Sequence, residues 1–267
     1  MDGDAKAASG YQERQITRHR GDALFVSSDC VAEELPVALV FNGISHVVMM
    51  ATPLHLEELA TGFALTEGIV DRPSQIYDVE VQQLPAATQV LLTIAEECFV
   101  RLKERRRTLT GRTGCGICGI ESLALLDLTA APIPAVPLPD PLGPAIARAA
   151  RELGQHQDLM RMTGCVHAAA WCGMDGGVQY VFEDVGRHNA LDKLVGHLAQ
   201  QKAKQGSGFV FLSSRASSEL TIKAARAGIP LLATISAPTS LAIDIARHSG
   251  LKLVCFCRAD GFVDYSA

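Results

Sequence analysis

The sequence predicts an α/β protein: a layered α/β domain with a mixed, partly parallel sheet, preceded by a smaller N-terminal α+β region. Apolar residues make up 48% of the 267 residues, enough for a substantial core, and only 5% are aromatic. Short apolar stretches alternate with helix-like segments over residues 145–267, and this alternation is typical of a sheet covered by helices. Strand pairs of the hairpin type instead dominate residues 36–94.

The N-terminal region is predicted over residues 21–127, after a polar segment, 1–20, that we expect to be a flexible tail. Its clearest signal is Asn42-Gly43, which separates two apolar stretches and favours a tight hairpin. Thr52-Pro53 has the residue types that cap and begin a helix, and Gly68 has the type that ends one. The elements expected here are a hairpin over 36–50, a helix over 53–67, strands over 76–83 and 88–94, and a basic helix over 97–107.

A proline-rich linker is predicted over residues 128–144, because it holds six of the twelve prolines. The C-terminal domain, residues 145–267, follows it with a regular rhythm of elements. The strands expected there are 166–171, 178–182, 209–212, 231–235 and 251–256. The helices expected between them are 145–160, 188–203, 217–227 and 240–249.

The strongest chemical signal is a pair of cysteines, Cys115 and Cys118, in the stretch 113–119. The three glycines of this stretch make its backbone permissive. A run of arginines and one lysine over residues 101–112 precedes the pair, and nearby cations stabilise a thiolate, which is both a nucleophile and a metal ligand. We interpret the pair as reactive thiols on a mobile loop.

A zinc-binding module without enzymatic activity is the main alternative, in which Cys255 with Cys257, or Cys165 with His167, would complete a tetrahedral set with the pair. We expect Cys255 and Cys257 to point to opposite faces of their strand, and we interpret them as buried core thiols. The same interpretation is given to Cys30, Cys98 and Cys172. A zinc deaminase is disfavoured, because the H-x-E followed by P-C-x-x-C of that chemistry is absent.

Polar loops follow four of the strands predicted in the C-terminal domain. These loops are 183–189, 213–217, 236–240 and 257–261. Parallel strands would bring them to one edge of the sheet, where open α/β sheets bind ligands. Three of them begin helices, whose free N–H groups attract phosphate, and Arg187, Arg215 and Arg258 add guanidinium donors. The sequence therefore predicts an anionic ligand here, with Asp184 or Asp260 accepting hydrogen bonds from a purine or a sugar.

The overall composition narrows the class of protein further. A net charge of −5 argues against a general nucleic-acid binder. The N-terminus lacks an apolar signal core, and no apolar run approaches the roughly 20 residues of a membrane span. We therefore expect a cytoplasmic protein that does not bind membranes and whose cysteines are reduced.

Four stretches together resemble the formate dehydrogenase accessory sulfurtransferase family: TGCGICG, EDVGRHNALDK, SSRASSE and SAPTSLA. The resemblance implies a cytidine deaminase-like fold in the larger domain, a homodimer, and a cytoplasmic sulfur carrier. Such a protein accepts persulfide sulfur from a cysteine desulfurase. It passes the sulfur to the molybdenum cofactor, bis-molybdopterin guanine dinucleotide, before that cofactor enters formate dehydrogenase.

The same resemblance implies roles for residues of this chain. Cys115 would carry the persulfide with help from Cys118, GDP would be an analogue of the cofactor, and the protein would hold no metal of its own. The segment 256–261 resembles the family's cofactor-binding stretch, although Ala259-Asp260 stands where we expect a glycine soon after the arginine. The cofactor-binding residues predicted from this segment and the polar loops are Phe256, Cys257, Arg258, Ala259, Asp260, Gly261, Arg187, His188, Ser214, Arg215, Ser236 and Thr239.

Overall fold

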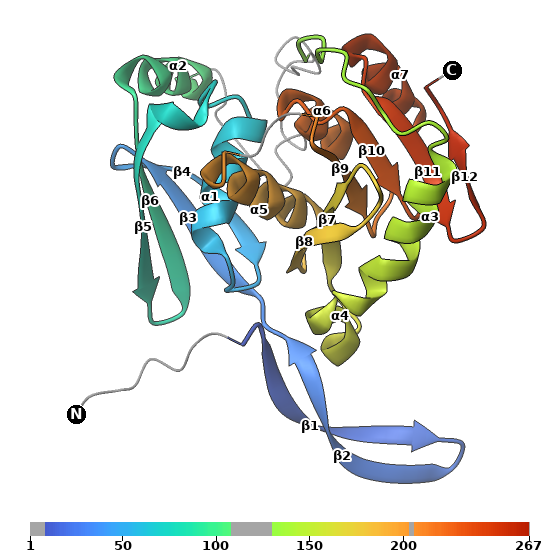
Figure 1. The fold of residues 1–267 in the computed structure, drawn as a ribbon. Helices are drawn as coiled ribbons and strands as arrows, with labels where there is room; N and C mark the ends of the chain where they lie inside the picture. Colours follow the sequence, from blue (N-terminus) through green and yellow to red (C-terminus); the bar gives the residue numbers. More distant parts are fainter. Residues whose placement is uncertain (1–8, 108–129, 203–205, 267) are drawn as a thin grey trace.

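The structure, a computed structural model, describes residues 9–107, 130–202 and 206–266. These residues form a two-stranded ribbon, a four-stranded sheet and a six-stranded sheet. The four-stranded sheet belongs to the N-terminal region and the six-stranded sheet to the C-terminal domain, with helices α1 (Leu56–Thr66) and α5 (Arg187–Gln200) between them (Figure 1). The predicted α/β class, with a mixed sheet and a smaller N-terminal α+β region, is confirmed.

The ribbon pairs β1 (Tyr11–Arg20) with β2 (Ala23–Ala32) and projects away from the body of the molecule (Figure 1). The prediction of a flexible tail is therefore wrong for residues 11–20, which form a strand. Both faces of the ribbon are largely exposed, so its sequence lacks the alternation of apolar and polar residues that marks a half-buried strand.

The four-stranded sheet has the order β4-β3-β6-β5. Its strands are β3 (Leu35–Phe41), β4 (Ile44–Ala51), β5 (Ile76–Leu84) and β6 (Ala87–Ile94). Asn42 and Gly43 have φ angles of 45° and 82°, as a type I′ turn requires, so the predicted hairpin is confirmed. The helix α2 (Glu96–Arg107) confirms the predicted basic helix, and with α1 it shares a core that includes Leu39, Phe41 and Leu92.

The helix α1 begins at Leu56 rather than at Pro53, so the prediction that Thr52 caps it is wrong. The residue before the helix is His55, which has a left-handed conformation with φ of 55°. The amide and the hydroxyl of Thr52 instead donate hydrogen bonds to the buried carboxylate of Asp184, at 3.1 and 2.9 Å. Thr52 has the residue type of a helix cap, but its amide and hydroxyl donate to the carboxylate of Asp184, which belongs to a strand far away in the sequence.

The six-stranded sheet has the order β12-β11-β10-β9-β7-β8. Its strands are β7 (His167–Gly173), β8 (Val178–Asp184), β9 (Gly208–Leu212), β10 (Leu231–Thr234), β11 (Lys252–Arg258) and β12 (Gly261–Asp264). The neighbours β9, β10 and β11 pair in parallel, whereas β7, β8 and β12 pair antiparallel. The predicted strands are present, and β12 is an additional one.

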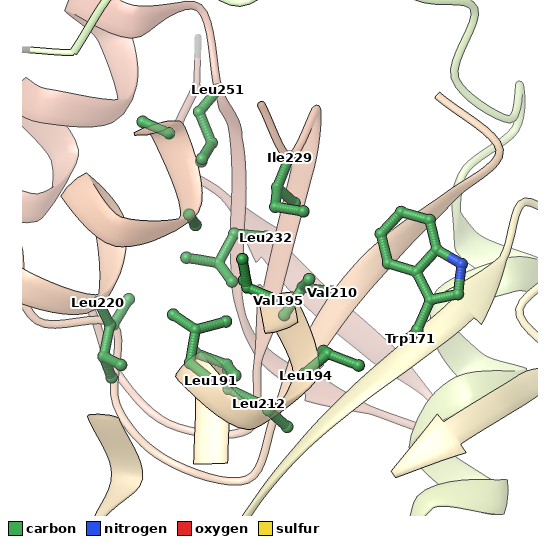
Figure 2. Close-up of a cluster of buried hydrophobic side chains, with 14 of the residues drawn as sticks. Trp171, Leu191, Leu194, Val195, Val210, Leu212, Leu220, Ile229, Leu232 and Leu251 are labelled. Atoms are coloured by element: carbon green, nitrogen blue, oxygen red, sulfur yellow. The ribbon is translucent and has the colours of Figure 1, made fainter. Parts of the chain in front are cut away.

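Both faces of this sheet are covered. The helices α6 (Ser218–Arg226) and α7 (Ser240–Ser249) lie with α5 on one face, over a core that contains Leu194, Val210 and Leu232 (Figure 2). The other face packs on α3 (Gly143–Glu152) through Ile146 and Phe211. The single helix predicted over 145–160 is wrong, because α3 ends at Glu152, a 3₁₀ turn (Leu153–Gln155) follows, and α4 (Asp158–Thr163) is separate.

The helices α1 and α5 join the two regions, and they pack so closely that their backbones touch. A Cβ atom on Gly62 would overlap the carbonyl oxygen of Asp192, and one on Gly196 would overlap the carbonyl oxygen of Glu58. Both glycines are therefore required by the close approach of the helices. This crossing fixes the direction of α5, whose N-terminus reaches the predicted ligand site.

Candidate functional site at the carboxyl edge of the sheet

Four strands of the six-stranded sheet run in one direction. The strands β9, β10 and β11 are parallel, and β8 has the same direction because β7 is antiparallel to both β8 and β9. Their carboxyl ends therefore lie at one edge, which we call the ligand edge. The helices α5, α6 and α7 begin there, after β8, β9 and β10. The predicted convergence of the four polar loops is confirmed.

The loops after β9, β10 and β11 are tied to each other by backbone hydrogen bonds. Ala216 and Pro238 form a parallel bridge, and the amide of Thr239 donates to the carbonyl of Ala216 at 3.0 Å. The amide of Phe256 donates to the carbonyl of Ser236 at 3.3 Å. These bonds place the N-termini of α6 and α7 side by side, so both helix dipoles point their positive ends at the ligand edge.

Two of the polar side chains at this edge cap helices. The hydroxyl of Ser217 accepts a hydrogen bond from the amide of Leu220 at 3.3 Å, and the hydroxyl of Thr239 accepts one from the amide of Ala242 at 3.2 Å. Ser214 is buried, and its hydroxyl donates to the carbonyl of Arg215. Thr239 and Ser214, both predicted ligand contacts, are thus engaged within the protein.

The start of α5 is linked to α6 by a close contact between His188 and Glu219. Nε2 of His188 lies 2.6 Å from Oε2 of Glu219, and the interaction with His188 holds the pKa of Glu219 below its usual value against the effect of burial. His167, at the start of β7, faces the same cluster. Burial lowers the pKa of its imidazole, and the nearby charges of Arg187 and His188 lower it further. The cluster therefore favours a neutral His167 beside the guanidinium of Arg187.

The three arginines predicted to bind phosphate differ in how many of their guanidinium nitrogens already have partners within the described residues. Arg215 is exposed, and no residue of the described segments forms a hydrogen bond or ion pair with its guanidinium group. Nε of Arg187 is buried and has no hydrogen-bond partner in the described part of the chain. In Arg258, Nη1 donates to the carbonyls of Ile235 (2.6 Å) and Cys257 (2.8 Å), which leaves Nη2 and Nε of this exposed side chain.

Phe256 has the most unusual conformation at this edge. Its φ angle is 55°, in the left-handed region that non-glycine residues avoid, and 43% of the residue is exposed. It lies within a register shift between β11 and β12, and bulges of this kind redirect a side chain. Strain of this kind costs about 1–2 kcal/mol, so an exposed aromatic ring held in this way is a candidate binding surface.

Two predicted contacts are not available to a ligand. Asp184 is fully buried: Oδ1 accepts from the Gly186 amide and from Asn189, and Oδ2 accepts from Thr52 and Lys193. The prediction that Asp184 contacts a purine or sugar is therefore wrong. Cys257 is also buried, and burial raises the pKa of its thiol to about 12. Ala259 and Asp260, in the turn after β11, and Gly261, the first residue of β12, are exposed.

The remaining cysteines support only part of the core interpretation. Cys98, Cys172 and Cys255 are buried, whereas Cys30 is half-buried. Cys255 and Cys257 belong to cores on opposite faces of the sheet. Residues two positions apart in a regular strand share a face, so regular alternation does not explain this. The two cysteines are separated by the left-handed conformation of Phe256 and the register shift around it. Cys165 is exposed. The pair Cys115 and Cys118 lies outside the described residues.

A family model described as the FdhD/NarQ family matches residues 32–267. The chain belongs to this family. It is 61% identical over 265 residues to the sulfur carrier protein FdhD of Chromobacterium violaceum, covering 98% of this chain and 97% of that protein. It is 58% identical over 263 residues to the protein of the same name from Burkholderia mallei, covering 96% of each chain. The resemblance inferred from the four motifs is confirmed.

The fold has a counterpart among solved structures. A crystal structure of a candidate formate dehydrogenase accessory protein from Desulfotalea psychrophila matches with a TM-score of 0.73 and 24% identity, covering 96% of this chain and 97% of that chain. Within the described segments, no three His, Cys, Asp or Glu side chains gather closely enough to hold a metal ion. None of the helices described is both long and apolar enough to cross a membrane.

Two residues of the ligand edge, His167 and Glu219, were not predicted as ligand contacts. His167 was considered only as a zinc ligand, and Glu219 was not considered at all. The signal for Glu219 is its place in the first turn of α6, directly after a predicted anion-binding loop. No local signal identifies its partner, because His188 and Glu219 meet only when α5 and α6 pack together.

Proposed function

We propose that this chain is a sulfur carrier protein that serves formate dehydrogenase. In this proposal Cys115 accepts sulfur from the persulfide of a cysteine desulfurase and passes it to bis-molybdopterin guanine dinucleotide before that cofactor is inserted. The observation that carries the proposal is the 61% identity, over nearly the whole chain, with a protein named as a sulfur carrier. The activity is thus that of a sulfurtransferase acting on the molybdenum cofactor.

The ligand edge supports binding of the nucleotide part of the cofactor. Three helix N-termini converge there and favour phosphate. Within the described segments, Nε of Arg187 and the guanidinium group of Arg215 have no partner, and guanidinium groups form short, strong hydrogen bonds with phosphate oxygens. The exposed ring of Phe256 offers a face on which a guanine stacks. GDP carries the same base and diphosphate and is therefore the natural probe.

The residue types around the cysteine pair support the sulfur step. A thiolate of Cys115 attacks the outer sulfur of the donor persulfide, the S–S bond of the donor breaks, and the donor cysteine leaves as a thiolate. Arginines near Cys115 in the sequence, such as Arg112, favour the thiolate that this attack needs. Cys118 lies close enough in the chain to exchange with a mixed disulfide or polysulfide at Cys115.

The remaining expectations belong to the same proposal. The desulfurase and formate dehydrogenase are the proposed protein partners, the cytoplasm is the proposed location, and a homodimer is the proposed assembly. In a dimer, two ligand edges would be available for the two guanines of one cofactor.

Mass spectrometry of the intact protein tests the sulfur step. After incubation with a cysteine desulfurase and cysteine, the wild-type chain should gain the mass of one sulfur atom, and Cys115→Ala should gain none. Cys118→Ala tests the assisting thiol and should load less sulfur, or none if the two cysteines act as a relay. Cys165→Ala is the matched control, because this exposed thiol lies outside the pair and its loss should leave loading unchanged. Loading of Cys115→Ala with full support of formate dehydrogenase would overturn the assignment.

A further inference from the structure

A cleft of about 1040 Å³ lies away from the ligand edge, between the N-terminal region and the C-terminal domain. We call it the β5 cleft. It is bounded by β5, by α1, by the C-terminal half of α5 and by the segment from α6 to β10. Its apolar lining includes Leu65, Trp171, Val195, Leu198 and Ile229. Charged residues such as Glu57, Asp78 and Lys202 also line it. A cleft of this size with a partly apolar lining has the character of a binding site, and the proposed function makes no use of it.

One wall of the cleft is the free edge of a sheet. In the described part of the chain, β5 is the last strand of the four-stranded sheet and pairs only with β6. The four successive residues 76–79 all line the cleft. Successive strand residues point to opposite faces, so the cleft must follow the backbone edge rather than one face. An open edge presents unpaired N–H and C=O groups that can pair with an added strand.

Two residues that line the cleft, Trp171 and Thr61, have polar groups without a hydrogen-bond partner in the described part of the chain. Both residues are buried for the most part, with 4% and 5% of their surface exposed. The indole N–H and the Thr61 hydroxyl are nevertheless not among the described polar atoms that are fully buried and unpaired, so both can be reached from the cleft. A Cβ atom on Gly208 would overlap the indole ring, so the ring lies directly against the backbone there. A carbonyl oxygen in the cleft would accept the indole N–H.

We propose that the β5 cleft binds an extended, apolar peptide segment of a partner protein by strand addition to β5. The peptide backbone pairs with residues 76–79, and its apolar side chains on one face contact Leu198 and Ile229. A peptide carbonyl accepts the indole N–H of Trp171. An extended peptide has regularly spaced N–H and C=O groups that can pair with the edge of β5 and accept the indole N–H. Its side chains alternate in direction, so those on one face can contact the apolar residues of the cleft.

A capped hexapeptide of alternating threonine and valine is the probe. Trp171 is the one tryptophan of the chain, so its fluorescence reports directly on the cleft. Two further peptides carry N-methyl groups on alternate residues, either the even or the odd ones. Alternate residues of a strand direct their N–H groups to the same edge, so one methylated peptide should lose binding about tenfold and the other should bind like the parent.

Variants of the protein test the location. Ala199→Phe adds a ring to a residue that lines the cleft and should weaken peptide binding by at least about tenfold. Gln201→Phe is the matched control on the exposed side of the same helix end and should leave binding unchanged. Binding of GDP should be the same in both variants, since the ligand edge is separate.

Several outcomes would overturn the proposal. Equal loss of binding for both methylated peptides would exclude strand addition, and so would no loss for either. Amides of residues 76–79 that are already protected from hydrogen exchange without peptide would mean that the edge is occupied by this chain or by a second copy. Peptide binding with protection of these amides, lost in Ala199→Phe alone, is the expected result.

Discussion

The ammonium of Lys193 lies 2.6 Å from the carboxylate of Asp184, and neither side chain is exposed to solvent. Thr52 donates two hydrogen bonds to the same carboxylate, so the pair joins the N-terminal region to the start of α5. Burial lowers the pKa of Lys193, and the charge of Asp184 opposes this effect. Part of the EDVGRHNALDK motif therefore holds the two regions together instead of contacting a ligand.

Removing the charge of Asp184 should strongly destabilise the protein. We expect Asp184→Asn to lower the free energy of unfolding by about 3–5 kcal/mol, because it leaves the ammonium of Lys193 buried without a counter-charge. Urea denaturation followed by circular dichroism measures this. The double variant Asp184→Asn/Lys193→Met should recover part of the loss. Asp71→Asn, which breaks the exposed ion pair with Arg101, should cost far less, and similar losses would contradict the prediction.

The contact between α1 and α5 should tolerate no side chain at its closest point. We expect Gly62→Ala to destabilise the protein by about 1–3 kcal/mol or more, because the added methyl group forces the helices apart. Thermal unfolding measures the change. Gly143→Ala is the control, since a Cβ atom at Gly143 would meet nothing within 4 Å. A Gly62→Ala protein as stable as the control would mean that the helices do not pack as described.

Phe256 should lower the stability of the folded protein and raise its affinity for GDP. Phe256→Gly removes the cost of the left-handed conformation and should stabilise the protein by about 1 kcal/mol, while it weakens GDP binding by the loss of the stacking ring. Calorimetry and urea denaturation measure the two effects. Lys202→Gly relieves a similar conformation, with φ of 51°, at the other end of α5 and should leave GDP affinity unchanged. Tighter or unchanged GDP binding by Phe256→Gly would exclude the ring as a contact.

His167 should make stability depend on pH near neutrality. Its pKa in the folded protein is lowered below 6.5, chiefly by burial, so the unfolded chain binds more protons as the pH falls through this value. The stabilising effect of the neutral imidazole is complete above about pH 6.5 and declines below it. We expect His167→Gln to lose less stability than the wild type between about pH 7.5 and 5.5. Parallel curves for the two proteins in urea denaturation would refute this.

The elements with strong local signals could be predicted from the sequence. Asn42-Gly43 predicted its hairpin, because the turn type depends on residues that accept positive φ. The polar loops after β9 and β10 predicted a common ligand edge, since parallel strands end together. In contrast, the break between α3 and α4 was missed, although Gly154 and the polar residues 155–158 interrupt the apolar pattern at the 3₁₀ turn. The β1–β2 ribbon was missed because neither of its faces is buried.

The sequence by itself determined the class of fold, the order of most helices and strands, and the family, since these depend on local patterns and on motifs. Only the tertiary structure decided which polar residues are free to meet a ligand. Asp184 and Arg187 stand in the same motif, yet the carboxylate of Asp184 accepts a hydrogen bond from Thr52, 132 positions away, whereas Nε of Arg187 has no partner among the residues that the structure describes. Burial and pairing are set by contacts between distant segments, and a local pattern cannot specify them.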